Sequence, residues 1–334
     1  MIVVDKVSKY YGSRRAVADL SFEIRAGECI GFLGLNGAGK STTLRLLSCL
    51  LLPTSGRISV RGLDVVTHPH EIRKFIGYLP DIPPLYPEMT VREYLDFAGR
   101  LRGLAGAELD KRRDRVTSLC SLREVIRSPI SQLSHGYRQR VGIAQAIIHA
   151  PSLLILDEPI QGLDPVQIVE MRKMIGELRG EHTILLSTHI LSEIEATCDR
   201  ILVMHQGHIA AEGSETQLAS RLLANRMLHV EVRGSADGLK SALAPIQEVR
   251  KLQIEPGADG LVRAILQVDD GAREQVSRAI VQANLGLLSM QIESTGLEAV
   301  FLQLSSGNAA RSGAPAAPIA ATPSVPHETE EVRR

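Results

Sequence analysis

A glycine-rich loop between an apolar run and a helix-forming segment constrains the fold of this chain most. The stretch GLNGAGKST follows ECIGFL and leads into TLRLLSCL. Gly34, Gly39, Lys40 and Ser41 satisfy the pattern G-x-x-x-x-G-K-[ST], which requires a strand before it and a helix after it. A chance glycine-rich loop is the alternative, but both flanking elements are present. The sequence therefore predicts an α/β fold with a phosphate-binding loop.

The residue types in this loop suit a nucleotide with its metal ion. Glycines allow successive backbone N–H groups to converge on a phosphate, and the helix N-terminus adds positive potential. Lys40 would reach the β- and γ-phosphates, and the Ser41 hydroxyl would ligate Mg²⁺. We therefore expect ATP and Mg²⁺ as cofactors.

Two later strand ends carry complementary chemistry. The run LLILDEP ends in Asp157 and Glu158, and HTILLSTH ends in His189. Asp157 would hold Mg²⁺, Glu158 would polarise a water as general base, and His189 would contact the γ-phosphate. A salt-bridged strand end and a structural histidine are the alternatives. The upstream loop favours the catalytic interpretation.

A second phosphate-binding turn is predicted at LSHGYRQR, where Ser134 and Gly136 precede a helix. A helix N-terminus favours an anion by the same physics as the first loop. One nucleotide cannot be held by both elements of one subunit if the intervening helices project away from the core. A head-to-tail dimer, with Lys40 of one subunit facing Ser134 of the other, satisfies both elements.

Hydrophobic periodicity divides the chain into three parts. Residues 1–220 alternate apolar runs with helical stretches, with an antiparallel β layer before Gly27 and a helical insert at about 88–150. Residues 226–305 show the order strand, helix, strand, strand, helix, strand, which predicts a small ferredoxin-like α+β domain; a loose β extension is the alternative. Residues 306–334 are rich in Ala, Pro and Ser, which predicts a disordered tail.

Composition excludes several classes of protein. The 38 basic and 38 acidic residues cancel, so bulk charge gives no reason to expect nucleic acid as a partner. The four cysteines are scattered, which disfavours disulfides and zinc and fits a reducing cytosol. No apolar run approaches the roughly 20 residues of a membrane-spanning helix. We expect a soluble, cytoplasmic chain that meets a membrane only through a partner.

Taken in order, these motifs resemble those of the ABC ATPases. LSHGYRQR is followed by AQAI, LLILDEP, GLDP and STH, and the resemblance covers residues 1 to about 220. IGYLPDIPPLYPEMTVREYL and the extension ending GLEAVFLQL resemble the gliding-motility type of ABC-2 exporter ATPases. The resemblance implies an ATPase that dimerises with a second copy of itself and drives separate ABC-2 type permease subunits from the inner face of the cell membrane.

The resemblance also assigns site residues, position by position. Tyr11 would stack on adenine; the alternative is that either tyrosine of KYYG simply packs against the protein. Asp164 would bridge the two sites of the dimer. The predicted nucleotide-binding set is Tyr11, Gly34, Asn36, Gly37, Ala38, Gly39, Lys40, Ser41, Thr42, Ser134, His135, Gly136, Tyr137 and Asp164. The predicted metal set is Ser41, Asp81 and Asp157, and the predicted catalytic set is Lys40, Glu158 and His189.

The chain departs from the family pattern at four positions. Leu35 stands where proline is common, and His135 and Tyr137 replace the usual Gly and Gln. Asp81 replaces the usual Gln, and a carboxylate about 5 Å from a phosphate costs on the order of 3 kcal/mol unless a metal ion lies between them. Asp81 is therefore expected to be linked to the metal or turned away; a loop residue without a catalytic part is the alternative.

Two other functions compete with the exporter. A soluble ABC ATPase acting on ribosomes or DNA is disfavoured because the chain has one ATPase cassette and no heptad run. A P-loop regulator or kinase is disfavoured by the adjacent Asp157 and Glu158 and by the Ser134 turn. The sequence leaves the cargo open, because cargo meets the membrane subunits.

Overall fold

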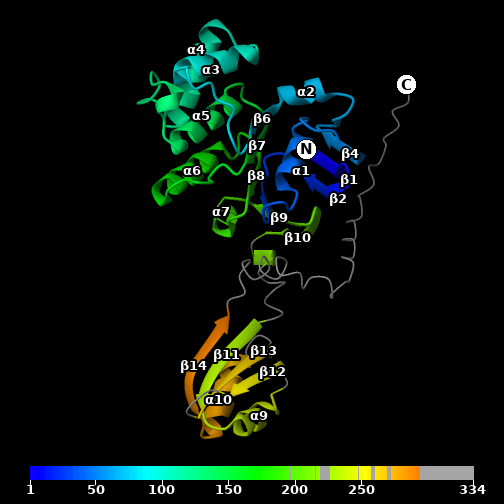
Figure 1. Ribbon diagram of the computed structural model, residues 1–334, viewed down its shortest axis with the longest axis vertical. Coiled ribbons are helices and arrows are strands. Elements are labelled where there is room, and N and C mark those ends of the chain that lie inside the picture. Colours follow the sequence, from blue (N-terminus) through cyan, green and yellow to red (C-terminus); the bar gives the residue numbers. More distant parts are fainter. Residues whose placement is uncertain are drawn as a thin grey trace, which may run out of the picture.

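The computed structural model describes residues 1–195, 197–214, 216–218, 226–246, 248–256, 260–268 and 272–293 (Figure 1). The predicted tail at 306–334 and the GLEAVFLQL segment lie outside these described residues.

A six-stranded sheet forms the centre of the N-terminal unit, with the strand order β10-β9-β3-β8-β7-β6. Neighbouring strands are parallel from β6 to β9, and only β10 runs antiparallel to its neighbour. The strands are β3 (Cys29–Leu33), β6 (Ile76–Leu79), β7 (Leu153–Asp157), β8 (Thr183–Thr188), β9 (Arg200–His205) and β10 (His208–Gly213). The predicted α/β core is confirmed.

Apolar side chains cover both faces of this sheet. In β7, Leu154 and Leu156 join one core cluster, whereas Leu153 and Ile155 join the other. The first cluster contains the helices α3 (Val91–Leu101), α4 (Gly106–Leu119), α5 (His135–Ile147) and α6 (Pro165–Leu178). The second contains α1 (Lys40–Leu47) and the β layer. Burial on both faces explains why β3, β7 and β8 are continuous apolar runs in the sequence.

The predicted antiparallel layer is a four-stranded sheet of order β2-β1-β4-β5. Its strands are β1 (Ile2–Tyr11), β2 (Arg14–Ile24), β4 (Ser55–Val60) and β5 (Leu63–Asp64), followed by helix α2 (Pro69–Lys74). Buried residues of β1 and β2 alternate with exposed ones, as expected of a sheet with one covered face.

The helical insert is built on defined helix starts. Thr90 caps α3 in a reciprocal capping box with Glu93, and Ser134 caps α5. A short 3₁₀ turn (Ile130–Gln132) precedes α5. Figure 1 shows α3, α4 and α5 on the side of the central strands away from α1. The helical insert therefore places Ser134 on a different side of the sheet from the glycine-rich loop.

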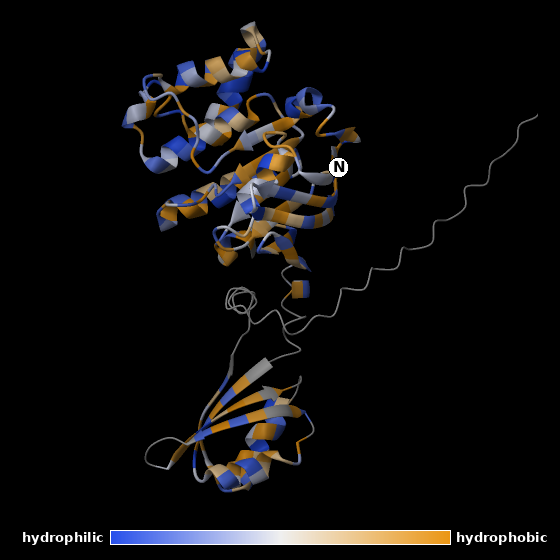
Figure 2. Cartoon of the chain, turned by 45° about the vertical axis from the view of Figure 1, so that its right-hand side comes forward, coloured by the Kyte–Doolittle hydropathy of each residue, from blue (hydrophilic) through white to orange (hydrophobic). Residues whose placement is uncertain are grey.

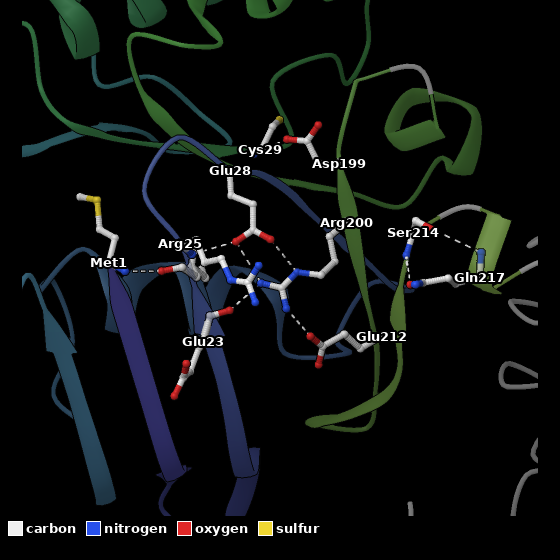
Figure 3. A network of polar contacts seen from close by, with 11 residues as sticks. Met1, Glu23, Arg25, Glu28, Cys29, Asp199, Arg200, Glu212, Ser214 and Gln217 are labelled. Carbon is white, nitrogen blue, oxygen red and sulfur yellow. Dashed lines mark hydrogen bonds and ion pairs between the residues drawn. The ribbon is translucent and has the colours of Figure 1, made fainter. Parts of the chain in front are cut away.

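Arg200 at the start of β9 links three segments of the N-terminal unit (Figure 3). Its guanidinium donates to Glu28 over 2.9 and 3.1 Å, and it also pairs with Glu212 of β10 and bonds the Glu23 carbonyl. Glu28 in turn accepts from the Arg25 amide. This network holds β10 and the end of β2 to the strand that leads into the glycine-rich loop.

The C-terminal unit has the element order β11 (Arg226–Arg233), α9 (Ala236–Leu243), β12 (Val249–Pro256), β13 (Leu261–Val268), α10 (Ala272–Gln282) and β14 (Gly286–Glu293). Its four strands are antiparallel in the order β12-β13-β11-β14, which is a ferredoxin-like arrangement. Hydrophobic and hydrophilic residues alternate along these strands (Figure 2). The apolar side chains pack beneath α9 and α10, with Leu228, Val232 and Leu266 fully buried.

Among the helices in the described part of the chain, none is long and apolar enough to cross a membrane. The remaining helix of the N-terminal unit, α7 (Leu191–Glu195), follows β8.

Candidate nucleotide site

The glycine-rich loop has a backbone shape that requires glycine. Gly37 and Gly39 have φ angles of 83° and 106°, a region that L side chains rarely adopt. A Cβ atom on Gly34 would lie 2.6 Å from the Met204 carbonyl oxygen, and one on Gly39 would lie 2.7 Å from the Ala16 carbonyl oxygen. The loop thus packs against the strands on either side and turns directly into α1, whose first N–H groups receive no side-chain cap.

Lys40 lies beneath this loop and is already paired. Its side chain is 5% exposed, and Nζ donates to the Gly34 carbonyl at 2.8 Å. Nζ also lies 3.1 Å from Oε1 of Glu158. The ammonium therefore joins the glycine-rich loop to the end of β7.

Asp157 is the last residue of β7 and is nearly fully buried. Its Oδ1 accepts from Ser41 Oγ at 3.0 Å and from Ser187 Oγ at 2.7 Å. Its Oδ2 is buried and has no hydrogen-bond partner among the described residues. Burial raises the pKa of Asp157; Asp81 and Glu158 raise it further, while the bonds from Ser187 and Ser41 lower it. A buried, unpaired carboxylate oxygen beside a serine hydroxyl fits a hard cation such as Mg²⁺.

Glu158 contacts two of the predicted catalytic side chains. Its carboxylate pairs with Lys40 through Oε1 and with His189 Nδ1 through Oε2, the latter at 3.0 Å. Its backbone has φ 49°, and its amide donates to Ser187 at 3.1 Å. A glutamate in the left-handed region is uncommon and is often maintained at functional sites.

Asp81 follows β6 and faces the same cavity. It is exposed, and its backbone carbonyl accepts from Gln139 Nε2 of α5 at 3.3 Å. Its charge contributes to raising the pKa of Asp157, so the two carboxylates lie within electrostatic range. Asp81 and Ser41 line one cavity, and Ser41 bonds Asp157, so the three predicted metal residues lie near one another with oxygen atoms of the kind that Mg²⁺ prefers.

Lys40, Ser41, Asp81 and Glu158 line a cavity of about 660 Å³, whereas Asp157 and His189 lie behind this lining and contact Ser41 and Glu158, respectively. Tyr11 lies at its edge, 46% exposed, with Lys9 Nζ 5.7 Å from its ring centroid. Of the predicted residues, the lining includes Tyr11, Asn36, Gly37, Gly39, Lys40, Ser41, Thr42, Asp81 and Glu158. Gly34 and Ala38 lie in the loop without lining the cavity; Ala38 is 6% exposed.

Sequence reasoning missed several residues here. Arg14, Arg15, Arg45, Gln161 and Gln206 also line the cavity, and Ser187 fixes both Asp157 and Glu158. Ser187 was detectable in principle, since it lies two residues before His189 on a strand that ends at the site. Gln161 and Arg45 lie next to recognised motifs without being part of them, and Arg14, Arg15 and Gln206 come from segments that carry no motif.

The second predicted phosphate-binding turn does not reach this cavity. Ser134 Oγ accepts from the Tyr137 amide at 3.4 Å, and His135 Nε2 lies 3.0 Å from the Gln161 carbonyl. Gly136 and Tyr137 line a different cavity, of about 450 Å³. Asp164 caps α6 by accepting from the Gln167 amide at 2.9 Å. The structure therefore brings Lys40, Asp157, Glu158 and His189 together, whereas Ser134 to Tyr137 do not line this cavity and meet it only where His135 contacts Gln161.

The fold and this site define a P-loop ATPase of the ABC type. The family model described as ABC transporter matches residues 17–161. The chain is 34% identical to the bacitracin transport ATP-binding protein BcrA of Bacillus licheniformis, over 92% of this chain and 98% of that protein. It is 33% identical to the linearmycin resistance ATP-binding protein LnrL of Bacillus subtilis (strain 168), over 91% of this chain and 98% of that one.

Solved structures of ABC ATP-binding subunits are also similar to this chain. One described as the ATP-binding subunit of an ABC transporter has a TM-score of 0.61 and 34% identity, covering 66% of this chain and 93% of that chain. A dimeric ATP-binding cassette in a post-hydrolysis state, bound to ADP and Pi, has a TM-score of 0.59 and 25% identity, covering 64% and 98%. The chain belongs to the ATP-binding proteins of ABC transporters. It binds ATP with Mg²⁺ and is an ATPase.

Proposed function

We propose that this chain is the ATPase subunit of an ABC-2 type exporter and works as a head-to-tail homodimer. The observation that carries the proposal is the separation of the two phosphate-binding elements. The Lys40 loop and the Ser134 turn line different cavities of one chain. Relatives named for bacitracin transport, linearmycin resistance and Nod factor export, together with dimeric structural neighbours, support it.

In the proposed dimer, ATP lies between the glycine-rich loop of one subunit and Ser134 to Tyr137 of the other. Tyr11 stacks on adenine, and Asp164 lies between the two sites. Lys40 exchanges its contact with Glu158 for the phosphates of ATP. Glu158, released from Lys40 but still bonded to His189, then accepts a proton from the attacking water.

Asp157, Ser41 and Asp81 are the proposed ligands of Mg²⁺, which supplies charge neutralisation at the β- and γ-phosphates when bound. The unpaired Oδ2 of Asp157 is the atom whose environment most requires a cation. Ser187 holds the other oxygen of Asp157 at 2.7 Å and so orients the carboxylate.

A groove beside α2 and α3 is the candidate docking site for a membrane partner. Its volume is about 940 Å³, and it is lined by apolar groups such as Leu50 and Leu101, which are 56% and 71% exposed. None of its lining residues is acidic; the ionisable ones are Arg45, His70, Arg73, Lys74, Tyr78, Arg102 and His149. We propose that a short helix of the permease with an acidic residue docks here, which places this ATPase on the inner face of the cell membrane.

The test is co-purification with a Glu158→Gln variant, which should bind ATP and hydrolyse it slowly. Membranes are extracted gently with ATP present, and captured proteins are identified by mass spectrometry. A polytopic membrane protein at near-equal stoichiometry is expected. Glu177→Gln, an exposed change on α6, serves as the matched control and should capture less of it.

Capture of ribosomal or DNA-bound proteins, with nothing from the membrane, would reject the exporter in favour of a soluble ABC ATPase. That outcome would not contradict ATP-dependent dimerisation, which is tested separately.

A further inference from the structure

Arg14 stands opposite Tyr11 across a two-residue hairpin. Strands β1 and β2 are joined by Gly12 and Ser13, and Tyr11 and Arg14 are register partners. Gly12 has φ 59°, as the tight turn requires. The hairpin thus fixes Arg14 beside the aromatic ring proposed to hold adenine.

The Arg14 side chain reaches toward the glycine-rich loop. Its Nη2 would lie 3.9 Å from a Cβ built on Gly37, and Arg14 lines the 660 Å³ cavity along with Gly37 and Lys40. Arg14 therefore approaches the loop from the Tyr11 side, between the proposed adenine and phosphate positions.

Arg14 has no hydrogen-bond or ion-pair partner in the described part of the chain, whereas Lys40 and Arg15 of the same cavity each have one. Lys40 pairs with Glu158, and Arg15 Nη2 lies 3.2 Å from His208 Nε2. Arg45 bonds Tyr78. Within the described part of the chain, Arg14 makes neither a hydrogen bond nor an ion pair with another residue, and it is exposed. Because Arg14 lies beside the glycine-rich loop and is not paired with a carboxylate, its guanidinium is available to an anionic group of a ligand in this cavity.

We propose that Arg14 binds the α- and β-phosphates of the nucleotide held by the same subunit. The guanidinium fork donates two N–H groups to phosphate oxygens, which a lysine at this position would do less well. The nucleotide would then be contacted by two cations, Arg14 near the adenosine and Lys40 near the γ-phosphate. This inference rests on the nucleotide site proposed above.

The test compares ATP and ADP affinities of Arg14→Gln by calorimetry on the full chain. Both affinities are expected to fall roughly tenfold, because the charge-assisted hydrogen bonds from the guanidinium to the phosphates are lost. The ratio of the two affinities should stay unchanged, and Arg14→Lys should recover part of the loss. Arg100→Gln, which removes the same charge from the exposed surface of α3, should leave both affinities at the starting value.

Three results would overturn the inference. Unchanged affinities for both nucleotides exclude a phosphate contact, and loss of ATP affinity alone assigns Arg14 to the γ-phosphate instead. Equal losses in Arg14→Gln and Arg100→Gln would mean that only overall charge matters. Lys40→Ala distinguishes a wrong role for Arg14 from a wrong nucleotide site. If Lys40→Ala abolishes nucleotide binding while Arg14→Gln does not weaken it, the site is correct and Arg14 takes no part in it. If Lys40→Ala does not abolish binding, the proposed nucleotide site is wrong.

Discussion

One carboxylate connects the binding and catalytic parts of the site at the scale of single residues. Glu158 contacts Lys40 at 3.1 Å and His189 at 3.0 Å. Because phosphates carry more negative charge than one carboxylate, we expect ATP to take Lys40 from Glu158. The base then becomes free to accept a proton only when its substrate is present.

The sequence predicted the members of this cluster but not their contacts. Lys40, Asp157, Glu158 and His189 follow from motif chemistry, since each lies at a strand end or in the glycine-rich loop. The ion pair between Lys40 and Glu158 was not predicted. The motif indicates how Lys40 contacts the phosphates of a ligand, but it does not indicate which protein group Lys40 contacts when no ligand is bound. Arg14 was missed because a lone arginine after a turn carries no signal.

Asp81→Asn tests the metal role of the one acidic departure from the family pattern. ATP binding should persist, but roughly tenfold more Mg²⁺ should be needed for half-maximal hydrolysis, because one anionic ligand becomes neutral. The measurement is a Mg²⁺ titration of ATPase activity. Asp5→Asn, an exposed change on β1, is the control. A titration curve that does not move would remove Asp81 from the metal site.

At the scale of elements, the position of α5 depends on a close approach to β6. A Cβ on Gly77 would lie 2.1 Å from the Ala146 carbonyl oxygen, and one on Gly142 would lie 2.5 Å from Leu79 Cδ1. This packing sets where α5 begins, and so where Ser134 lies. Periodicity predicted the long helices and apolar strands, but β5 has two residues and β6 has four, too few to show a period.

His149, just beyond α5, makes this junction sensitive to acid. Its Nε2 lies 3.1 Å from the Ile76 carbonyl oxygen, and burial, with Arg102 nearby, lowers the pKa of His149 to about 4. The unfolded chain binds a proton below about pH 6.5, whereas the folded one does not until about pH 4. Stability from this group is therefore present above pH 6.5 and lost as the pH falls toward 4.

We expect His149→Gln to reduce that loss, since glutamine keeps a donor for Ile76 and does not titrate. Between pH 7.5 and 5, the variant should lose less unfolding free energy than the parent chain, by on the order of 1 kcal/mol. Urea unfolding at the two pH values measures this difference. Exposed His70→Gln is the control, and equal losses in parent and His149→Gln would contradict the assignment.

At the scale of the whole molecule, we propose that each chain carries two unlike halves of a nucleotide site. The glycine-rich loop lies with the second core cluster, and the Ser134 turn lies with the helices of the first. The two elements line different cavities of one chain, which is why we propose that a second copy supplies the missing half.

The most direct measurement is the mass of the Glu158→Gln chain by light scattering, with and without ATP, beside Glu158→Gln combined with Ser134→Arg. The account predicts that ATP doubles the mass of the single variant with two nucleotides bound per dimer. The double variant should keep its affinity for ADP, because the Lys40 loop is intact, but stay at its starting mass when ATP is added. Doubling of the double variant, or no change in the single one, would contradict a site shared between Lys40 and Ser134 of two subunits.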